Sequence, residues 1–393
     1  MANMGKIKLL RISTETYSLR LLLKGQLKYM SENGMDVYMA ATPDSHVPEL
    51  ERDQNAKFFP LPLSRELTPV KDLIALFHTI RLIREIKPDI VHTHSPKAGT
   101  VGMLAAVLCG VPVKIHTVAG LPLMEVNGAK RVLLNWVEKF TYWCADWVLP
   151  NSQELRIFIL KNLLPDDKKV IVLGNGSSNG IDLNYFARTS SVVEDANRFK
   201  LERGIQPDDI VLGFLGRLAF YKGVNELVKA FLLLKSKHTR LKLLLIGAPE
   251  ELNPLQATTE SEIENNPSII AVGHQKDVRS FLIASDIFVF PSYREGFPQA
   301  LLQASAMGLP CVATNINGCN EMIEDGKTGF LIAPKSAEAI VSACEKLIEN
   351  RRKSEEMGKL AQKFVLENFE QQYLWRVIRE FYQTQYQIKK NNM

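Results

Sequence analysis

Two basic residues near the middle of the chain have types and spacing that suit a phosphate group. Arg217 follows Gly216 in the segment FLGRL, and Lys222 stands five residues later, next to Gly223 and a run with helical periodicity. A turn that leads from a strand into a helix presents free backbone amides, so a diphosphate there would meet two cations and several N–H donors. A surface turn with two solvated charges would have the same sequence, so the pair alone is a weak signal.

A carboxylate and an amide follow the apolar segment DIFVFPS. Glu295 comes after this expected strand, Gly296 would let the backbone approach a ligand closely, and Gln303 stands eight positions after Glu295 on the next expected helix. The two side chains could each bind a sugar hydroxyl in one cleft. A helix cap and a solvated helix face are the alternative interpretation.

Three of the seven histidines, His92, His94 and His116, lie at or near the ends of the expected strands PDIVHTH and VPVKIHT. No metal site is expected, because no carboxylate or cysteine accompanies them at ligand spacing. The five cysteines are scattered and lack CxxC spacing, so we expect reduced and mostly buried thiols. A direct role is considered for His94 and for His116, against the commoner role of an imidazole in the core or on the surface.

The segment STETYS, residues 13–18, forms an expected turn ahead of a helix and carries hydroxyl groups. A dinucleotide-binding fold often has a GxGxxG sequence at this position, and a P-loop has the Walker sequence. Neither sequence occurs here. NAD, FAD and phosphoryl transfer by a P-loop are therefore not expected.

These residues must be positioned by strands and helices, and the sequence contains two series in which strands and helices alternate. The first runs from KIKLLRI, through a helical stretch at about 19–33, to VPVKIHTVAG; the second begins after residue 180 and includes DIVLGFLGRL and LKLLLIGAPE. Such alternation indicates parallel sheets flanked by helices, so we predict an α/β protein with two doubly wound domains. In these sheets, ligands bind at the carboxyl ends of the strands.

The boundary between the two domains is expected within residues 174–191, where Gly, Ser and Asn crowd together and the apolar periodicity ends. We predict one Rossmann-like domain over residues 1–180, a second over 190–370, and a cleft between them. The helical stretch 371–393 is expected to pack back on the first domain.

The chain has 393 residues and a net charge of +5, and its basic excess lies in the first half. Residues 1–180 carry 22 Lys and Arg against 17 Asp and Glu, whereas the rest carries 26 of each kind. This asymmetry favours an anionic partner such as a phosphate-bearing lipid or an acidic membrane surface, although ordinary surface variation would also produce it. No apolar run approaches the roughly 18 residues that span a bilayer, and the amino terminus lacks a signal-peptide pattern. A cytoplasmic location is expected, with no nucleic-acid partner.

Several longer segments resemble a known family. GRLAFYKGVNELVKAF and PSYREGFPQALLQASAMGLPCVATNINGCNEMIEDGKTGFLI resemble the donor domain of family-4 retaining glycosyltransferases with the GT-B fold. VHTHSPKAGTVGMLAAVLCGVPVKIHTVAG and DWVLPNSQEL are similar to bacterial enzymes that build capsule, exopolysaccharide or lipid-linked glycans. Essentially the whole chain is covered. The resemblance implies an acceptor-side N-terminal domain and a C-terminal domain that binds a nucleotide sugar.

The resemblance also implies roles for the candidate residues. Arg217 and Lys222 would hold the nucleotide diphosphate and neutralise the leaving group, so that transfer needs no metal or cofactor. Glu295 matches the first Glu of the family's E-x7-E pattern and would contact the donor sugar. Gln303 stands where the second Glu binds ribose hydroxyls, and an amide can still accept one of those hydrogen bonds. Further donor-side contacts are expected from Gly216, Gly296, Phe297, Pro298 and Leu301.

The chain departs from the family after the strand VPVKIHT. Many relatives read TVHG where this chain reads TVAG, so Ala119 cannot supply the histidine that faces the donor sugar. His94 or His116 could supply the missing polar contact, or the backbone at Ala119 and Gly120 could suffice. We favour the backbone, since retaining transfer in this fold is thought to use the leaving phosphate as base.

Two further comparisons with the family concern single segments. The glycine-rich first turn of the family is replaced by residues 13–18, which leaves Thr14 and Ser18 as candidate acceptor-side or phosphate-side contacts. Glu321, in NGCNEMI, matches another recurrent family carboxylate, to which we assign a structural role.

The function implied by the resemblance is transfer of a hexose or N-acetylhexosamine from a nucleoside-diphosphate sugar, expected to be UDP-linked, to a glycan on a polyprenyl diphosphate or another cell-surface glycan. A nucleotide-sugar 2-epimerase of the same fold and a non-catalytic partner subunit remain alternatives; Gln303 and Ala119 would permit the second. Peripheral contact with the inner face of the membrane is a further hypothesis, because residues 70–87 and 129–143 combine apolar side chains with flanking Lys and Arg. Both stretches could equally be helices packed on the sheet.

Overall fold

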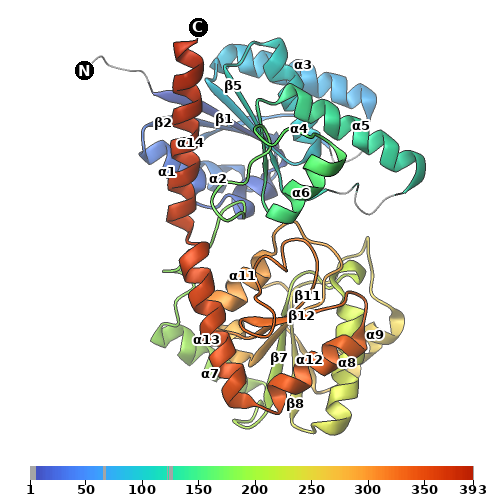
Figure 1. Ribbon diagram of the computed structural model, residues 1–393. Helices are drawn as coiled ribbons and strands as arrows, with labels where there is room; N and C mark the ends of the chain where they lie inside the picture. The colour runs from blue at the N-terminus through green and yellow to red at the C-terminus, as the bar shows by residue number, and fades with distance from the viewer. Residues whose placement is uncertain (1–5, 65–67, 122, 124–126, 393) are drawn as a thin grey trace. The chain divides into compact units, whose positions relative to one another are not determined.

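The computed structural model describes residues 6–64, 68–121, 123 and 127–392. The chain forms two compact units: unit 1 consists of Met1–Gly180 and Gln371–Met393, and unit 2 of Ile181–Glu370 (Figure 1). The chain first passes from unit 1 to unit 2 between Gly180 and Ile181, inside the Gly-, Ser- and Asn-rich segment 174–191. Residues 1–5 of the expected first domain and residue 393 of the expected C-terminal stretch lie outside the described residues.

Unit 1 is built around a parallel sheet, which has six strands among the described residues, in the order β3-β2-β1-β4-β5-β6. The two central strands are buried along most of their length, as expected for strands that helices cover on both faces. The strands are β1 (Ile7–Glu15), β2 (Met35–Thr42), β3 (Lys57–Pro60), β4 (Ile90–His94), β5 (Val113–Val118) and β6 (Trp147–Pro150).

Helices cover both faces of this sheet. On one face, Gly102 lets α4 approach β4 so closely that an added Cβ would touch Thr93. On the other face, Tyr382 of α14 reaches His92 of β4. The helices of unit 1 are the π-helix η1 (Ser18–Leu22), α1 (Gln26–Glu32), α2 (Val47–Gln54), α3 (Pro69–Ile86), α4 (Pro96–Leu108), α5 (Gly128–Cys144), α6 (Gln153–Asn162) and α14 (Gln371–Asn391).

The C-terminal helix α14 belongs to unit 1 because one of its faces is apolar. Leu374, Ile378 and Tyr382 are spaced four residues apart, so they share a face of the helix, and all three are buried in a core cluster with β1 and β2. The indole Nε1 of Trp375 also donates a hydrogen bond to Asn179 Oδ1 at 2.7 Å. The last helix of the chain therefore packs against the sheet with which the chain begins.

The start of unit 1 differs from the sequence prediction. The first half of the expected turn 13–18 is strand, because β1 continues to Glu15 with an irregularity in register after Ile12. The expected single helix 19–33 is interrupted: η1 ends at Leu22, and α1 begins after Gly25, whose φ of 79° is a left-handed conformation. Glycine adopts this conformation without steric cost, and it breaks the run of helical hydrogen bonds.

Unit 2 repeats the same architecture. Its described residues form a six-stranded parallel sheet in the order β12-β11-β10-β7-β8-β9. The strands are β7 (Ile210–Leu215), β8 (Leu241–Ile246), β9 (Ile269–Ala271), β10 (Ile287–Phe290), β11 (Cys311–Thr314) and β12 (Gly329–Ile332). The helices are α7 (Ser190–Glu202), the 3-10 helix η3 (Phe220–Lys222), α8 (Val224–Lys237), α9 (Ala257–Asn265), α10 (Arg279–Ala284), α11 (Gln299–Ala306), α12 (Ala337–Ile348) and α13 (Arg351–Asn368).

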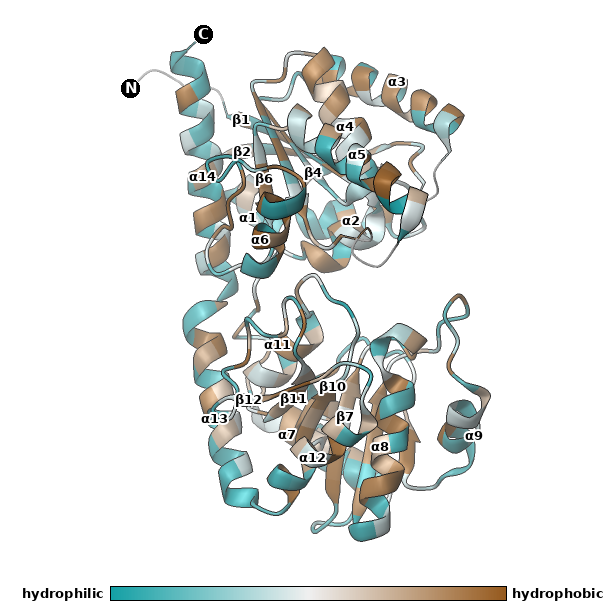
Figure 2. Cartoon of the chain, turned by 45° about the vertical axis from the view of Figure 1, so that its right-hand side comes forward, coloured by the Kyte–Doolittle hydropathy of each residue, from teal (hydrophilic) through white to brown (hydrophobic). Residues whose placement is uncertain are grey.

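The predicted α/β fold with two doubly wound parallel sheets is confirmed. In unit 2 the apolar strands lie beneath helices such as α8 that carry polar residues on their outer side (Figure 2). Within the described part of the chain, no helix has the length and apolarity needed to cross a bilayer.

Candidate functional site

The first candidate site lies in unit 2, at the turns that leave β7 and β10. Lys222 ends η3, and its Nζ lies 2.5 Å from Glu295 Oε1, in the turn after β10. The two side chains are only 15 % and 13 % exposed. Gly223 makes this approach possible, since its φ is 71° and an added Cβ would collide with the carbonyl oxygen of Pro291. The structure therefore brings together two residues that the sequence analysis placed in separate motifs.

Arg217 has a different acidic partner, which the sequence analysis missed. Its Nη1 donates to Glu250 Oε1 at 2.7 Å, and the hydroxyl of Tyr221 donates to Glu250 Oε2 at 2.9 Å. Glu250 follows β8, which pairs with β7 in the sheet. An acidic residue directly after the strand LKLLLI, at the same sheet edge as Arg217, was the available signal.

Basic side chains surround the ring of Tyr221 in this site. The guanidinium carbon of Arg294 lies 4.4 Å from the centre of its ring, and that of Arg217 lies 5.5 Å away. Burial raises the pKa of Tyr221 to about 12, so its ring is uncharged at neutral pH and attracts cations by its face. Three basic side chains, those of Arg217, Lys222 and Arg294, thus gather around one aromatic ring.

The turn that carries Glu295 is braced by the segment after β11. Asn317 Nδ2 donates to the carbonyl oxygens of Glu295 at 2.9 Å and of Gly296 at 3.1 Å. Gly318 lies so close that an added Cβ would contact the Gly296 carbonyl oxygen. The carboxylate is therefore held by a fixed backbone, as a binding group should be.

Three of the residues predicted to line the donor site have buried side chains, and their contact with a donor stays a prediction. Phe297 and Leu301 are buried in the core of unit 2, and the Phe297 ring packs against Phe369 with ring centres 5.3 Å apart. Pro298, also buried, caps the start of α11, which carries the partly exposed Gln303. The side chains of Phe297, Pro298 and Leu301 therefore face the core of unit 2, whereas Gln299 and Ala300 between them are partly exposed.

The histidines of unit 1 do not form one group. His94 ends β4 and shares a face with His92, because side chains alternate along a strand. His116 pairs in register with Thr93, and its Nδ1 lies 2.8 Å from Thr93 Oγ1, on the face that α4 covers. An added Cβ at Gly99 of α4 would collide with the His116 ring. His116 is thus a packed core residue on the opposite side of the sheet from His94.

Burial removes the charge from both candidate histidines. Burial, with the nearby Arg11 guanidinium and the ring of His116, lowers the pKa of His94 to about 3. Burial alone lowers the pKa of His116 to about 3. Both rings are neutral at neutral pH, so neither has an acidic proton to give to a leaving group.

The remaining predicted contacts of unit 1 lie at the carboxyl ends of its strands. Thr14 is buried, with its Oγ1 2.8 Å from Ser95 Oγ, whereas Ser18 is partly exposed at the start of η1. Ala119 and Gly120 follow β5 directly and are partly exposed. Among these four residues, Ser18 and the Ala119–Gly120 backbone are reachable from solvent.

Over the described ranges, no three His, Cys, Asp or Glu side chains are placed to hold a metal ion.

The comparisons with known proteins agree with this architecture. The family model "Glycosyl transferases group 1" matches residues 195–364, in unit 2, and the model "Glycosyl transferase 4-like domain" matches residues 23–176, in unit 1. The capsular polysaccharide biosynthesis glycosyltransferase CapM of Staphylococcus aureus is 32% identical over 92% of this chain and 93% of its own length. An Escherichia coli UDP-Gal:alpha-D-GlcNAc-diphosphoundecaprenol alpha-1,3-galactosyltransferase is 27% identical over 83% of each chain.

Solved structures show the same fold at lower identity. Anabaena HepE, solved in complex with UDP, matches with a TM-score of 0.79 at 18% identity, over 96% of this chain and 100% of its own. A glycosyltransferase from Rickettsia africae matches with a TM-score of 0.81 at 21% identity, over 97% of this chain and 98% of its own. With the fold and the relatives in agreement, the chain belongs to the family-4 glycosyltransferases of GT-B fold, of the type that builds capsule and related glycans.

Proposed function

We propose that this glycosyltransferase moves a hexose or N-acetylhexosamine from a UDP-sugar, with retention, to a glycan carried on a polyprenyl diphosphate. The Lys222–Glu295 pair carries the proposal, because Lys222, Arg217 and the carboxylate of Glu295 lie at one sheet edge and suit a diphosphate and a sugar hydroxyl. Unit 2 would bind the donor and unit 1 the acceptor. The Escherichia coli relative is named for a UDP-Gal donor and a diphosphoundecaprenol acceptor, which supports this choice of donor and acceptor.

The proposed step uses these side chains as electrostatic groups. The bond from C1 of the sugar to the β-phosphate oxygen breaks, and a bond from C1 to the acceptor oxygen forms on the same face. The acceptor hydroxyl proton passes to the departing diphosphate, whose developing charge Arg217 and Lys222 stabilise. Glu295 would orient the sugar by accepting hydrogen bonds from its hydroxyls. The step needs no acid from unit 1, which fits the neutral His94 and His116.

Donor binding tests the central pair. A panel of UDP-, GDP- and ADP-sugars is measured by thermal unfolding, where a ligand at 100 times its Kd adds about 2.7 kcal/mol of stability. We expect a UDP-sugar to give this response and Lys222→Ala and Glu295→Ala to lose it. Lys229→Ala, in the exposed Lys229–Glu338 pair of α8, is the matched control and should respond like the parent. A UDP-sugar response that survives both site variants would contradict the proposal.

Transfer itself is tested with the responding donor and a short-chain polyprenyl-diphosphate glycan. We expect a product whose anomeric configuration, read from the coupling of its C1 proton, equals that of the donor. An inverted product would exclude the retaining mechanism, and isomerised UDP-sugar formed without acceptor would support an epimerase instead. Added chelator should leave the rate unchanged, since the proposed step uses no metal.

We also propose that unit 1 contacts the membrane that carries the acceptor. On α3, Val70, Leu73, Ile74 and Phe77 are exposed at helical spacing, and on α5 the exposed side chains include Trp136 (69 %) and Trp143 (71 %). Both helices pack against α4, so they lie on the same side of the sheet. An apolar stripe of this kind is suited to the interfacial region of a bilayer.

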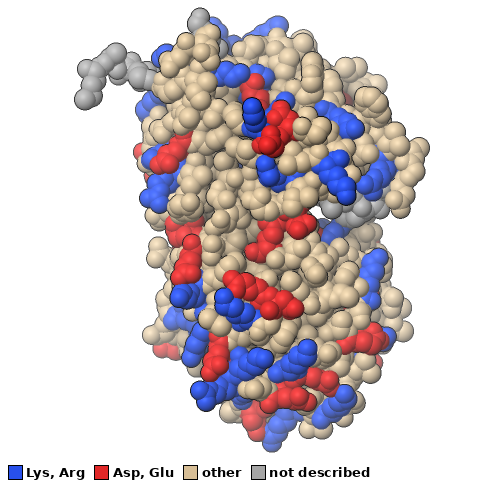
Figure 3. All heavy atoms as spheres, viewed as in Figure 1, with Lys and Arg blue, Asp and Glu red and all other residues tan. Residues whose placement is uncertain are grey.

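Basic side chains accompany this apolar surface. Lys71, Arg81 and Arg84 on α3 and Lys130 and Lys139 on α5 are exposed. In Figure 3, the right-hand side of unit 1, where Figure 1 shows α3 and α5, carries Lys and Arg with few Asp or Glu side chains. Attraction to anionic lipids would add to the apolar contact and would weaken as salt screens it.

Flotation with vesicles tests the membrane contact. We expect the protein to float with phosphatidylglycerol vesicles, less with phosphatidylcholine, and less at high salt. Trp136→Ser combined with Trp143→Ser should abolish flotation. Leu252→Ser removes an apolar side chain that is 89 % exposed in unit 2, and this control should float normally. Equal flotation of the Trp variant and the control would show that α5 is not the membrane contact.

A further inference from the structure

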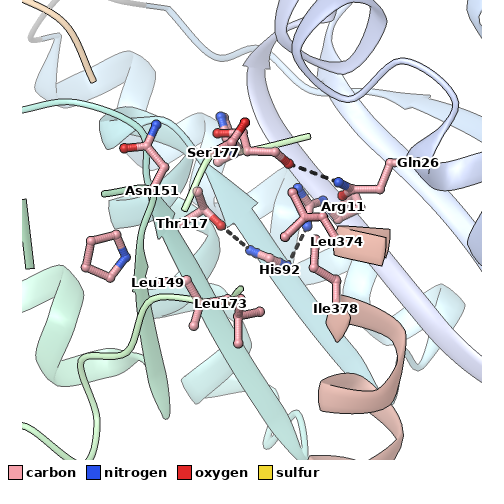
Figure 4. Close-up of a pocket in the computed structure, with 13 residues that line it drawn as sticks. Arg11, Gln26, His92, Thr117, Leu149, Asn151, Leu173, Ser177, Leu374 and Ile378 are labelled. Atoms are coloured by element: carbon pink, nitrogen blue, oxygen red, sulfur yellow. Dashed lines mark hydrogen bonds between the residues drawn. The ribbon is translucent and has the colours of Figure 1, made fainter. Parts of the chain in front are cut away.

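A buried arginine lies at the centre of the sheet of unit 1. Arg11, on β1, is 2 % exposed, and its Nη1 donates to the Tyr382 hydroxyl of α14 at 2.8 Å and to His92 Nδ1 at 2.5 Å. His92 Nδ1 accepts, so the proton is on Nε2, which lies 2.7 Å from Thr117 Oγ1 (Figure 4). The guanidinium is thus bound by neutral groups.

The charge of Arg11 has no counter-charge among the described residues. Neither its hydrogen bonds nor the ion pairs of the structure join it to a carboxylate. Burial and the Arg11 charge lower the pKa of His92 well below its ordinary value, and burial raises the pKa of Tyr382, so both groups are uncharged. A buried cation without a partner is costly, which makes an anionic ligand favourable at this place.

A pocket opens beside this arginine, and it contains polar atoms that lack partners. His94 is 2 % exposed, and neither of its ring nitrogens has a hydrogen-bond partner in the described structure. Asn151 Oδ1 is also buried without a partner. The pocket is lined by Arg11, Gln26, His92, His94, Thr117, Leu149, Pro150, Asn151, Leu173, Ser177, Ser178, Leu374 and Ile378 (Figure 4).

We propose that this pocket binds a phosphate group. A phosphate brings negative charge to Arg11 and oxygens that accept from the guanidinium and from the N–H of neutral His94. A singly protonated phosphate also has an O–H, which can donate to Asn151 Oδ1 or to the other ring nitrogen of His94. A carboxylate would supply the charge but has no proton to donate, so it would leave an acceptor unpaired.

Because of the position of the pocket, a bound phosphate would also contact the two segments that connect unit 1 with unit 2. Leu173, Ser177 and Ser178 come from the segment that leaves unit 1, and Leu374 and Ile378 come from the first turns of α14, where the chain returns. Gln26 Nε2 donates to the carbonyl oxygen of Ser178 at 3.0 Å, so the first segment is already tied to α1. A bound phosphate would hold both connecting segments on unit 1. This inference does not depend on the proposed donor.

Hydrogen exchange on the full-length protein tests the proposal with inorganic phosphate as the probe. At ten times its Kd, phosphate should slow exchange by local opening about tenfold in residues 173–180 and 371–382. Arg11→Met should lose this response, as should His94→Phe, which keeps the ring but removes both nitrogens. Arg52→Met, a 74 % exposed arginine of the same unit, is the matched control and should keep the response.

The variants also separate binding from folding. Because Arg11→Met removes an unpaired buried charge, it should unfold at a temperature no lower than that of the parent in phosphate-free buffer. Unchanged exchange in the parent with phosphate and with a short-chain prenyl diphosphate, or equal slowing in the parent and both site variants, would overturn the proposal.

Two sources of the phosphate group are distinguished by parallel measurements. Slowing by inorganic phosphate indicates a free ion as the ligand. Slowing only by a short-chain prenyl diphosphate, lost in Arg11→Met, indicates a phosphate carried by the acceptor lipid. Where inorganic phosphate slows exchange, sulfate, which has no proton at neutral pH, should act more weakly than phosphate.

Discussion

Lys222 and Glu295 neutralise each other, so a donor that binds to both side chains must compete with their ion pair. Their contact of 2.5 Å is shielded by low exposure, and it is therefore less screened by salt than a surface pair. A diphosphate that attracts Lys222 would leave Glu295 free to accept from sugar hydroxyls. The pair thus makes donor binding sensitive to both halves of the ligand, the phosphate and the sugar.

Glu138, on α5, makes unit 1 sensitive to pH. It is buried, and this burial raises its pKa to about 7 from an ordinary value of 4.5. The folded state therefore favours the protonated form, so Glu138 lowers stability progressively as pH rises from about 4.5 to about 7. We expect Glu138→Gln to gain about 1 to 3 kcal/mol over the parent at pH 8 and little at pH 4.5.

Urea unfolding at several pH values measures this difference. The buried histidines act in the opposite direction, because their lowered pKa values make stability fall as pH drops below 6.5, but they are present in both proteins and cancel. Glu85→Gln, at an exposed position of α3, is the control and should show no pH-dependent gain. A Glu138→Gln gain that is independent of pH would mean that packing, not ionisation, is the cause.

For single residues, the sequence predicted the contacts that follow from the order of strands and turns. Arg217, Lys222 and Glu295 follow strands, and parallel strands end at one sheet edge, so their closeness follows from the pattern. Glu250 was missed because its pairing with Arg217 spans 33 residues and depends on which strands are neighbours. The sequence did not predict that His94 and His116 lie on opposite faces of the sheet, since the face of each side chain depends on the register between β4 and β5, which no spacing along the chain gives.

Among the elements, the ends of β7 and β8 set the geometry of the proposed donor site. Gly247 follows β8 and lies against Gly216, which follows β7. An added Cβ at Gly247 would collide with the carbonyl oxygen of Gly216, so two strand ends can meet there only with glycine. This close approach places Glu250 within reach of Arg217.

Gly247→Ala should therefore disturb unit 2 strongly. The collision involves backbone, which cannot rotate away, so we expect a loss of about 2 to 4 kcal/mol in the free energy of unfolding and weaker donor binding. Gly204→Ala is the matched control: its φ is 63°, but an added Cβ would have nothing within 4 Å. It should lose only about 1 kcal/mol through backbone strain. Equal losses in urea unfolding would refute the steric argument.

The alternation of apolar runs predicted most elements, but it failed near residue 25. Leu19, Leu23 and Leu27 keep helical spacing across the break and are all buried, so the apolar pattern looks continuous. The left-handed φ of Gly25, beneath the Trp375 ring, interrupts the helix. That packing comes from α14, about 350 residues away in the chain, and so no local pattern could indicate it.

The whole molecule has separate cores. One core cluster consists of residues from 181–369, all in unit 2, whereas the two clusters of unit 1 combine residues 9–170 with Leu374, Ile378 and Tyr382 of α14. A domain that buries its own apolar surface is expected to unfold as its own cooperative unit. The molecule should therefore respond to ligands one unit at a time.

Calorimetry can resolve the two units through their ligands. We expect two unfolding transitions. A UDP-sugar should raise the midpoint temperature of only one of them, because the proposed donor-binding residues all lie in unit 2. Lys222→Ala should remove this shift without moving the second transition, and Glu138→Gln should move only the second transition at pH 8. If a single transition is observed, and both the UDP-sugar and Glu138→Gln change its midpoint temperature, the two units unfold together. In that case the coupling through residues 173–180 and α14 is stronger than their separate cores imply.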